Sequence, residues 1–117
     1  MNNKNIIDAL YCSFDGLKEL FKEKAAKREV FLLIISLFYI LIFKPKFIFT
    51  LLLLILPFII LAMEALNTAI EHLCNKITLK KSDKIKKIKD LGSAAIFLSL
   101  IIYFIVFFFS LYYQIIL

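Results

Sequence analysis

Three polar residues within eight positions have types and spacing that could support chemistry: Glu64, Asn67 and Glu71. They follow seventeen residues, 47 to 63, that contain no charge. Positions i, i+3 and i+7 share one face of a helix, so two carboxylates and a carboxamide point the same way. A charged side chain beside an apolar run of this length is expected to have a partner of opposite charge or a functional role. The pattern suits cation binding or proton transfer, whereas a solvated helix end or pairing with nearby lysines is the alternative.

The composition indicates which elements position these residues. The chain has 117 residues, of which 62% are hydrophobic, and it contains only two glycines and two prolines. Long uncharged apolar stretches are typical of membrane proteins, and the scarcity of helix breakers favours continuous helices over a barrel. The sequence therefore predicts a small all-α membrane protein, with residues 1–117 forming a single domain.

Apolar periodicity predicts an amphipathic helix over residues 5–28, which would lie on the membrane surface with its lysines at the headgroups. Three transmembrane helices are expected to follow it. The first is short for a bilayer, so its helix is expected to begin a turn or more earlier, near Ala25. The predicted spans cover residues 30–43, 47–70 and 92–116.

The second span is expected to continue as a helix to about Ile77, with Pro57 in its interior. Residues 78–90 are interpreted as a polar connection, and the third span as beginning after it. Phenylalanine and tyrosine crowd residues 103–113, as is typical of a membrane interface.

The fifteen basic residues are placed unevenly along the chain. Six precede Phe31, two flank Pro45, seven lie within 76–89, and none follows. The positive-inside rule then puts the N-terminus and the 76–89 segment in the cytoplasm and the C-terminus outside. Nucleic acid is a poor candidate partner, because anionic lipid explains basic clusters that adjoin membrane spans.

The two cysteines and the single histidine suggest no catalytic or metal site. Cys12 and Cys74 both fall on the predicted cytoplasmic side, where a disulfide is not expected, and two isolated thiols do not make a metal centre. His72, next to Glu71, is interpreted as an interfacial side chain, with a ligand role as the alternative.

On this topology, carboxylates and lysines gather at one membrane face, and the combination suits phosphoryl transfer. Carboxylates hold Mg²⁺, lysine neutralises phosphate, and a further carboxylate can accept the proton of an attacking hydroxyl. The sequence has no Walker A loop, glycine-rich kinase loop or G-x-S-x-G elbow, so helix ends and side chains would have to form any nucleotide site. The gathered residues are Glu23, Glu29, Glu64, Asn67, Glu71, Lys89 and Asp90.

The motif E-A-L-N-T-A-I-E at 64–71, followed by K-D-L-G-S-A-A at 89–95, resembles the bacterial integral-membrane diacylglycerol kinases. The resemblance covers the chain from Tyr11 to the third span. It implies a homotrimeric bundle in the bacterial inner membrane, with active sites shared between subunits at the cytoplasmic face. It also implies MgATP-dependent phosphorylation of the diacylglycerol hydroxyl to phosphatidic acid.

The resemblance also implies residue roles, by motif position. Glu64 matches the catalytic base, Asn67 a polar residue that supports it, and Lys89 with Asp90 the nucleotide-site pair. The implied sets are Glu64, Asn67 and Asp90 for catalysis; Glu23, Glu64, Glu71, Lys89 and Asp90 for ATP; Glu29, Glu64 and Ser93 for the lipid; and Glu23 and Glu71 for Mg²⁺.

The chain departs from the family pattern in two places. Glu23 falls on the second metal position only if one residue is deleted after Gly16; otherwise Lys24 takes that position. The gapped alignment is preferred because it keeps both acids. The 80–82 loop, Lys-Lys-Ser, lacks the family's usual acidic, aromatic and histidine residues, so nucleotide contacts there are not predicted.

Three alternatives to a diacylglycerol kinase are considered. Undecaprenol kinase has the same fold, but that branch commonly lacks the acid found here as Glu29. A non-enzymatic membrane protein would tolerate loss of the acids, and all are present. A small multidrug-type transporter uses four spans and a buried acid near the midplane, whereas the acids here cluster at one end.

Overall fold

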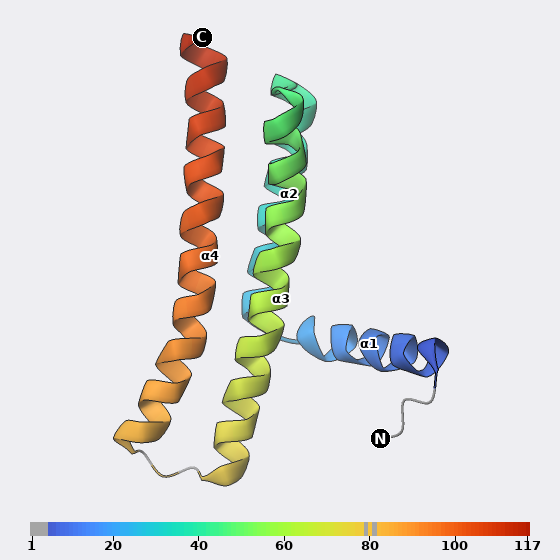
Figure 1. The fold of residues 1–117 in the computed structure, drawn as a ribbon, viewed down its shortest axis with the longest axis vertical. Helices are drawn as coiled ribbons and strands as arrows, with labels where there is room; N and C mark the ends of the chain where they lie inside the picture. The colour runs from blue at the N-terminus through green and yellow to red at the C-terminus, as the bar shows by residue number, and fades with distance from the viewer. Residues whose placement is uncertain (1–4, 79, 81) are drawn as a thin grey trace.

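The computed structural model describes residues 5–78, 80 and 82–117, so Lys81 of the lysine-rich loop lies outside the described residues. The described chain is helical and contains no strand. Of the four helices, three run side by side and one projects to one side (Figure 1). In chain order the helices are α1 (Ile6–Leu20), α2 (Lys24–Phe43), α3 (Phe47–Ile77) and α4 (Asp83–Ile116).

Helix α1 is the one that projects sideways (Figure 1). The Asn5 side chain caps it by accepting a hydrogen bond from the Asp8 amide at 2.9 Å. The helix ends at Leu20, so the predicted continuous helix over 5–28 is wrong at its C-terminal end. Five of the seven residues 22–28 are charged, and the apolar stripe therefore stops where the turn begins.

A buried cluster fixes this elbow between α1 and α2. Leu20 before the turn and Ala26 after it pack together with Leu61 of α3. Residues 24–28 thus belong to α2, which begins at Lys24, close to the start expected near Ala25. The location of α1 on a membrane surface stays a prediction.

The turn between α2 and α3 and the connection between α3 and α4 lie at opposite ends of the bundle (Figure 1). Lys44 ends α2 in the left-handed region, with a φ of 47°, and Pro45 prevents the helix from continuing. Helix α3 then covers Phe47–Ile77, as expected.

Helix α4 begins earlier than the predicted third span. The Ser82 hydroxyl accepts a hydrogen bond from the Ile85 amide at 3.2 Å, which caps the helix, and Asp83 lies in the first turn. The segment 83–90 is therefore helical rather than a connection. It places its lysines on a rigid extension of α4, past the level of α1 (Figure 1).

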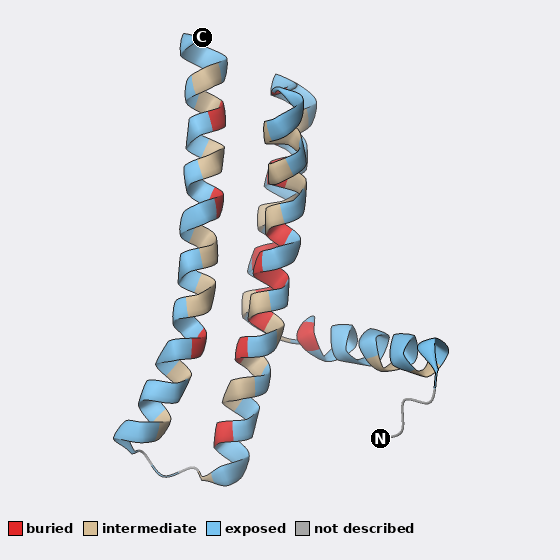
Figure 2. Cartoon of the chain, viewed as in Figure 1, coloured by how far each residue is buried: buried red, intermediate tan, exposed pale blue. Residues whose placement is uncertain are grey.

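Helices α3 and α4 are each long and apolar enough to cross a membrane. In the most apolar eighteen-residue stretch of each, only 22% of α3 and 11% of α4 is buried, and Figure 2 shows exposed residues along the length of both helices. A core helix of a soluble protein would bury most of such a stretch. Helix α2 has twenty residues but carries three charges at 27–29, so a third span stays a prediction.

Two hydroxyl bridges connect α2 to α4 inside the apolar bundle. The inner bridge joins Ser36 and Tyr103, and the outer bridge joins Tyr39 and Ser110 at 2.9 Å. Each of the four side chains is at most 6% exposed. Buried hydroxyls need partners, and these satisfy one another. Tyr103 is thus a core residue, and its interpretation as an interfacial aromatic is wrong.

Candidate active site

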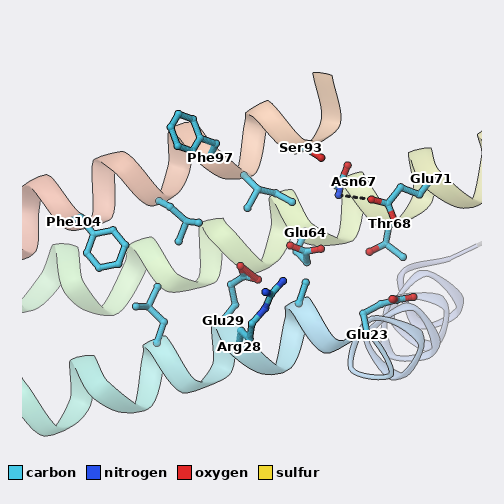
Figure 3. A pocket seen from close by; sticks show the side chains of 14 residues that line it. Glu23, Arg28, Glu29, Glu64, Asn67, Thr68, Glu71, Ser93, Phe97 and Phe104 are labelled. Carbon is cyan, nitrogen blue, oxygen red and sulfur yellow. Dashed lines mark hydrogen bonds between the residues drawn. The ribbon is translucent and has the colours of Figure 1, made fainter. Parts of the chain in front are cut away.

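One cavity of about 600 Å³ brings together acids from two helices. We call it the acid cavity, because four glutamates line it: Glu23 just before α2, Glu29 of α2, and Glu64 and Glu71 of α3 (Figure 3). Helix α4 supplies the facing wall, which includes Ser93. Residues that the sequence separates by almost fifty positions therefore surround one space.

Glu29 and Glu64 are the most buried of these acids, with relative exposures of 7% and 5%. Figure 3 shows their carboxylates close together, with the Arg28 guanidinium beside them. One oxygen of Glu29, Oε2, is buried and has no hydrogen-bond partner among the described residues. Buried carboxylates that repel each other need a proton, a cation or a hydroxyl donor. The pair can therefore accept the hydrogen of a bound hydroxyl group.

Asn67 contacts Glu71 rather than Glu64. Its Nδ2 donates to Glu71 Oε1 at 3.0 Å, one turn along α3. The resemblance implies that Asn67 supports the catalytic base, Glu64, whereas in the structure Asn67 orients the carboxylate of Glu71. The Asn67 side chain is only 5% exposed, so this orientation is fixed by packing.

Gly92 provides the packing that holds Asn67. A Cβ added at Gly92 would collide with Asn67 Oδ1, so any other residue here would require the Asn67 side chain or α4 to move. Oδ1 itself is buried and without a hydrogen-bond partner in the described part of the chain. Within one chain, Gly92 thus serves the contact between α3 and α4, and Ser93 next to it lines the acid cavity.

Glu23 lies at the elbow, where it is the N-cap residue of α2. Its Oε1 lies 3.5 Å from His72 Nε2 on α3, a contact that the sequence analysis did not anticipate. His72 itself is exposed and is not among the residues lining the acid cavity. Lys24, the competing candidate for the second metal position, does not line the acid cavity either.

Lys89 and Asp90 do not join the acid cavity. They line a second cavity of about 460 Å³ where α3 and α4 connect, which we call the lysine cavity because Lys80, Lys86 and Lys89 line it. Lys89 Nζ donates to Asn75 Oδ1 at 2.8 Å, and Lys86 Nζ to Asp90 Oδ2 at 2.7 Å. The sequence analysis missed both partners, although the i, i+4 spacing of Lys86 and Asp90 predicts their pairing.

The donor set of the acid cavity suits Mg²⁺ by its chemistry. Among the residues that the structure describes, no group of three or more His, Cys, Asp or Glu side chains is placed to hold a metal ion. Mg²⁺, however, commonly takes only one or two carboxylates and completes its shell with water and phosphate oxygens. Glu23 and Glu71 provide two carboxylates on one cavity and therefore fit such an ion.

Comparison with known proteins identifies the family. A search of curated proteins finds no match to this chain. The sequence model of the family described as prokaryotic diacylglycerol kinase matches residues 11–111, which include every residue that lines either cavity. The chain therefore belongs to the prokaryotic diacylglycerol kinase family, a family of lipid kinases.

Proposed function

We propose that the protein transfers the γ-phosphoryl group of ATP to the free hydroxyl of diacylglycerol, which yields phosphatidic acid and ADP. Family membership supports a lipid kinase. The observation that carries the proposal is the acid cavity between the helices, where two buried carboxylates face each other and one of their oxygens has no hydrogen-bond partner within the described residues. A buried acid pair of this kind suits an alcohol that arrives from a membrane.

In the proposed reaction, Glu64 accepts the hydroxyl proton while the hydroxyl oxygen bonds to the γ-phosphorus. The bond from that phosphorus to the oxygen bridging it to the β-phosphate breaks, and ADP leaves with that oxygen. Glu29 and Ser93 hold the glycerol end of the lipid. Asn67 keeps the Glu71 carboxylate in place through the 3.0 Å hydrogen bond.

Glu23 and Glu71 would hold Mg²⁺, whose chemical contribution when bound is to neutralise phosphate charge. Lys89 and Asp90 are proposed to contact the nucleotide, and Lys86 and Lys80 add positive charge around the same cavity. Lysines near phosphate groups lower the free energy of the charge that develops during transfer.

We further propose that the working site is shared between copies of the chain in a homotrimer. Within one chain the acid cavity and the lysine cavity are separate, although phosphoryl transfer requires their ligands to meet. The exposed apolar side chains of α2 to α4 provide surface for packing copies together. Mixing Glu64→Gln with Asp90→Asn subunits tests this: mixed oligomers should recover part of the activity, and absence of recovery after confirmed mixing would mean that each site lies within one chain.

The proposed topology puts both cavities at the cytoplasmic face of the bacterial inner membrane, where ATP is available. The N-terminus and the 76–89 segment are inside, and the C-terminus is outside. A tag within 80–87 that is accessible from outside would contradict this orientation.

The decisive experiment separates labelled lipid products by thin-layer chromatography. Purified protein is incubated with MgATP and either diacylglycerol or undecaprenol, with Glu64→Gln as the inactive control. Labelled phosphatidic acid is the expected product, and Glu29 in the acid cavity supports this choice over undecaprenol. Label in undecaprenyl phosphate alone would replace the proposed substrate, and label in neither lipid would refute lipid kinase activity.

A further inference from the structure

The turn between α2 and α3 and the C-terminal end of α4 border a third cavity, of about 290 Å³. We call it the turn cavity. Figure 1 shows the turn and the end of α4 at one end of the bundle, whereas the connection between α3 and α4, with the lysine cavity, lies at the other. The turn cavity therefore plays no part in the proposed reaction. Its lining residues are Lys44, Lys46, Tyr113, Gln114 and Leu117.

The turn cavity carries positive charge without a counter-charge. Residues 30–63 and 91–117 contain no Asp or Glu, and Lys44 and Lys46 are their only charged side chains. No ion pair joins either lysine to a carboxylate in the described part of the chain. Two ammonium groups that line one cavity and lack a carboxylate partner attract an anion.

Hydrogen bonds hold the donors of the turn cavity in place. Lys46 Nζ donates to the Tyr113 hydroxyl at 2.6 Å and lies 4.6 Å from the centre of the tyrosine ring. The hydroxyl accepts this bond, so its own hydrogen can be donated to a ligand. Gln114 Nε2 donates to the Phe43 carbonyl oxygen at 2.7 Å, which ties α4 to the end of α2. An oxyanion in the cavity would therefore meet donors from both the turn and α4.

Helix α3 begins directly after the turn and adds to the preference for an anion. Lys46 is the N-cap residue of α3, and its side chain makes no capping hydrogen bond. Amide groups that are not capped leave the N-terminus of a helix positively polarised, which favours an oxyanion. The lysines, the tyrosine hydroxyl and the helix end thus favour the same kind of ligand.

The position of the turn cavity indicates that the anion belongs to a lipid. Helices α3 and α4 are long and apolar enough to cross a membrane, and in a bilayer their ends at this cavity lie at the level of the headgroups. Phe47 is 78% exposed and Ile116 is 61% exposed, so apolar surface for acyl chains adjoins the cavity on both helices. Ligand pockets usually exceed about 300 Å³, and the turn cavity therefore fits a headgroup rather than a whole lipid.

We propose that the turn cavity binds the phosphate of an anionic phospholipid in the leaflet at this end of the bundle, which is the outer leaflet on the proposed topology. Lys44 and Lys46 neutralise the phosphate, and the Tyr113 hydroxyl donates to one of its oxygens. A zwitterionic phospholipid fits less well, because no carboxylate side chain lines the cavity to receive the ammonium group of its headgroup. The inference does not depend on the proposed kinase reaction.

Native mass spectrometry of the purified protein tests the inference, with phosphatidylglycerol and phosphatidylcholine as the two lipids. We expect the protein to retain phosphatidylglycerol more strongly, and Lys44→Gln and Lys46→Gln each to weaken this retention by about fivefold. The double variant Lys44→Gln/Lys46→Gln should lose the preference. Lys84→Gln/Lys87→Gln is the matched control, because it removes the same charge from exposed positions that line neither the turn cavity nor the lysine cavity.

Two results of this experiment would overturn the inference. One is equal retention of the two lipids by the wild-type protein. The other is an equal loss in the two double variants, which would mean that lysines bind anionic lipid wherever they lie on the helices. Glycerophosphoglycerol, the headgroup without its acyl chains, separates a lipid from a free phosphate ester. If it displaces phosphatidylglycerol at an equal concentration, the ligand is not a lipid and the inference fails.

A second pair of variants tests the donors without changing the charge, and it remains informative if the lysine variants fail to assemble. Tyr113→Phe removes the hydroxyl at the turn cavity and should weaken retention of phosphatidylglycerol by about fivefold. Tyr112→Phe removes the neighbouring hydroxyl, which does not line the cavity, and should leave retention unchanged. Equal retention by these two variants would contradict the inference.

Thermal unfolding provides an independent readout, since a ligand that binds only the folded protein stabilises it. Adding phosphatidylglycerol to phosphatidylcholine bilayers should raise the thermal midpoint of the wild-type protein more than that of Lys44→Gln/Lys46→Gln. A midpoint that this double variant lowers equally in both bilayers would instead assign the lysines to the carbonyl groups at the end of α4, and would overturn the inference.

Discussion

The acid cavity and the lysine cavity balance their charges in different ways. In the acid cavity, Glu29 and Glu64 are nearly inaccessible, and one of their oxygens has no partner in the described chain. In the lysine cavity, the Lys86 and Asp90 side chains are 75% and 61% exposed, and they form an ion pair at 2.7 Å. The first cavity therefore has an unbalanced negative charge that a ligand can neutralise, whereas in the second the charges of Lys86 and Asp90 already neutralise each other.

This difference between the two cavities indicates at which residues a substitution should have a large effect on activity and stability, and at which residues the effect should be small. Removing charge from a desolvated pair alters both the proton affinity and the packing of its neighbours. Removing one member of an exposed pair leaves the other in water, where salt screens it. Substitutions in the acid cavity should accordingly have large effects, and those at the exposed pair small ones.

The largest effect is expected for Glu64→Gln. The amide keeps the shape of the side chain but cannot accept the hydroxyl proton, so kcat should fall by about 10² or more. Glu19→Gln is the matched control, because Glu19 is an exposed acid on α1 that pairs with Lys22 at 2.9 Å. Near-normal turnover of an assembled Glu64→Gln protein would remove Glu64 from the role of base.

The next effect concerns Mg²⁺. Glu23→Ala and Glu71→Ala should each raise the Mg²⁺ concentration needed for half-maximal activity by about tenfold or more, because two carboxylates share a strongly hydrated ion. Lys24→Ala is the neighbouring control and should leave the Mg²⁺ titration unchanged. If Lys24→Ala shifts the titration and Glu23→Ala does not, the ungapped alignment is the correct one.

A smaller effect is expected at the contact between Gly92 and Asn67. Gly92→Ala forces the Asn67 carboxamide to move, which should reduce the free energy of unfolding by about 1–3 kcal/mol and lower kcat through Glu71. Gly16→Ala is the control, since no heavy atom lies within 4 Å of the added Cβ and alanine favours helix. Equal thermal stability of the two variants would show that the contact is not tight.

The sequence predicts much of the fold, because long apolar runs without charge are compatible with few structures other than membrane-spanning helices. Helix α3 has the expected bounds, since a proline-containing turn precedes it and a polar segment follows it. The break at residues 21–23 was not predictable from local preference. Lysine, glutamate and alanine all favour helix, and the elbow depends on tertiary packing of Leu20 and Ala26 against Leu61.

The candidate site was predicted less completely than the fold. The spacing of Glu64, Asn67 and Glu71 placed them on one helix face. It did not indicate which of the two carboxylates would accept the hydrogen bond from Asn67. The inclusion of Lys89 and Asp90 with these acids rested on the predicted topology and on the position of a motif, whereas the early start of α4 carries both residues to another cavity. Tyr103 resembled an interfacial aromatic because its partner, Ser36, is 67 residues away.

The smallest effect is expected at the exposed ion pair. Lys86→Ala should leave the thermal midpoint unchanged within error, because both partners remain hydrated. Asp90→Ala provides the reciprocal measurement and separates the ion pair from any contact of Asp90 with nucleotide, which would appear in the KM for ATP. A clear loss of stability in Lys86→Ala would mean that the lysine cavity is less solvated than its exposure indicates.

The elbow at residues 21–23 lets α1 act as a rigid arm that is attached to the bundle at one end, and Glu23 lies at the point of attachment. Fifteen residues of helix give an arm of about 22 Å. A rocking motion that carries the free end of this arm through several ångströms moves the point of attachment by only a small fraction of that distance. Movement of the free end of α1, such as a membrane surface would cause at the predicted location of this helix, therefore displaces the Glu23 carboxylate much less than the rest of α1.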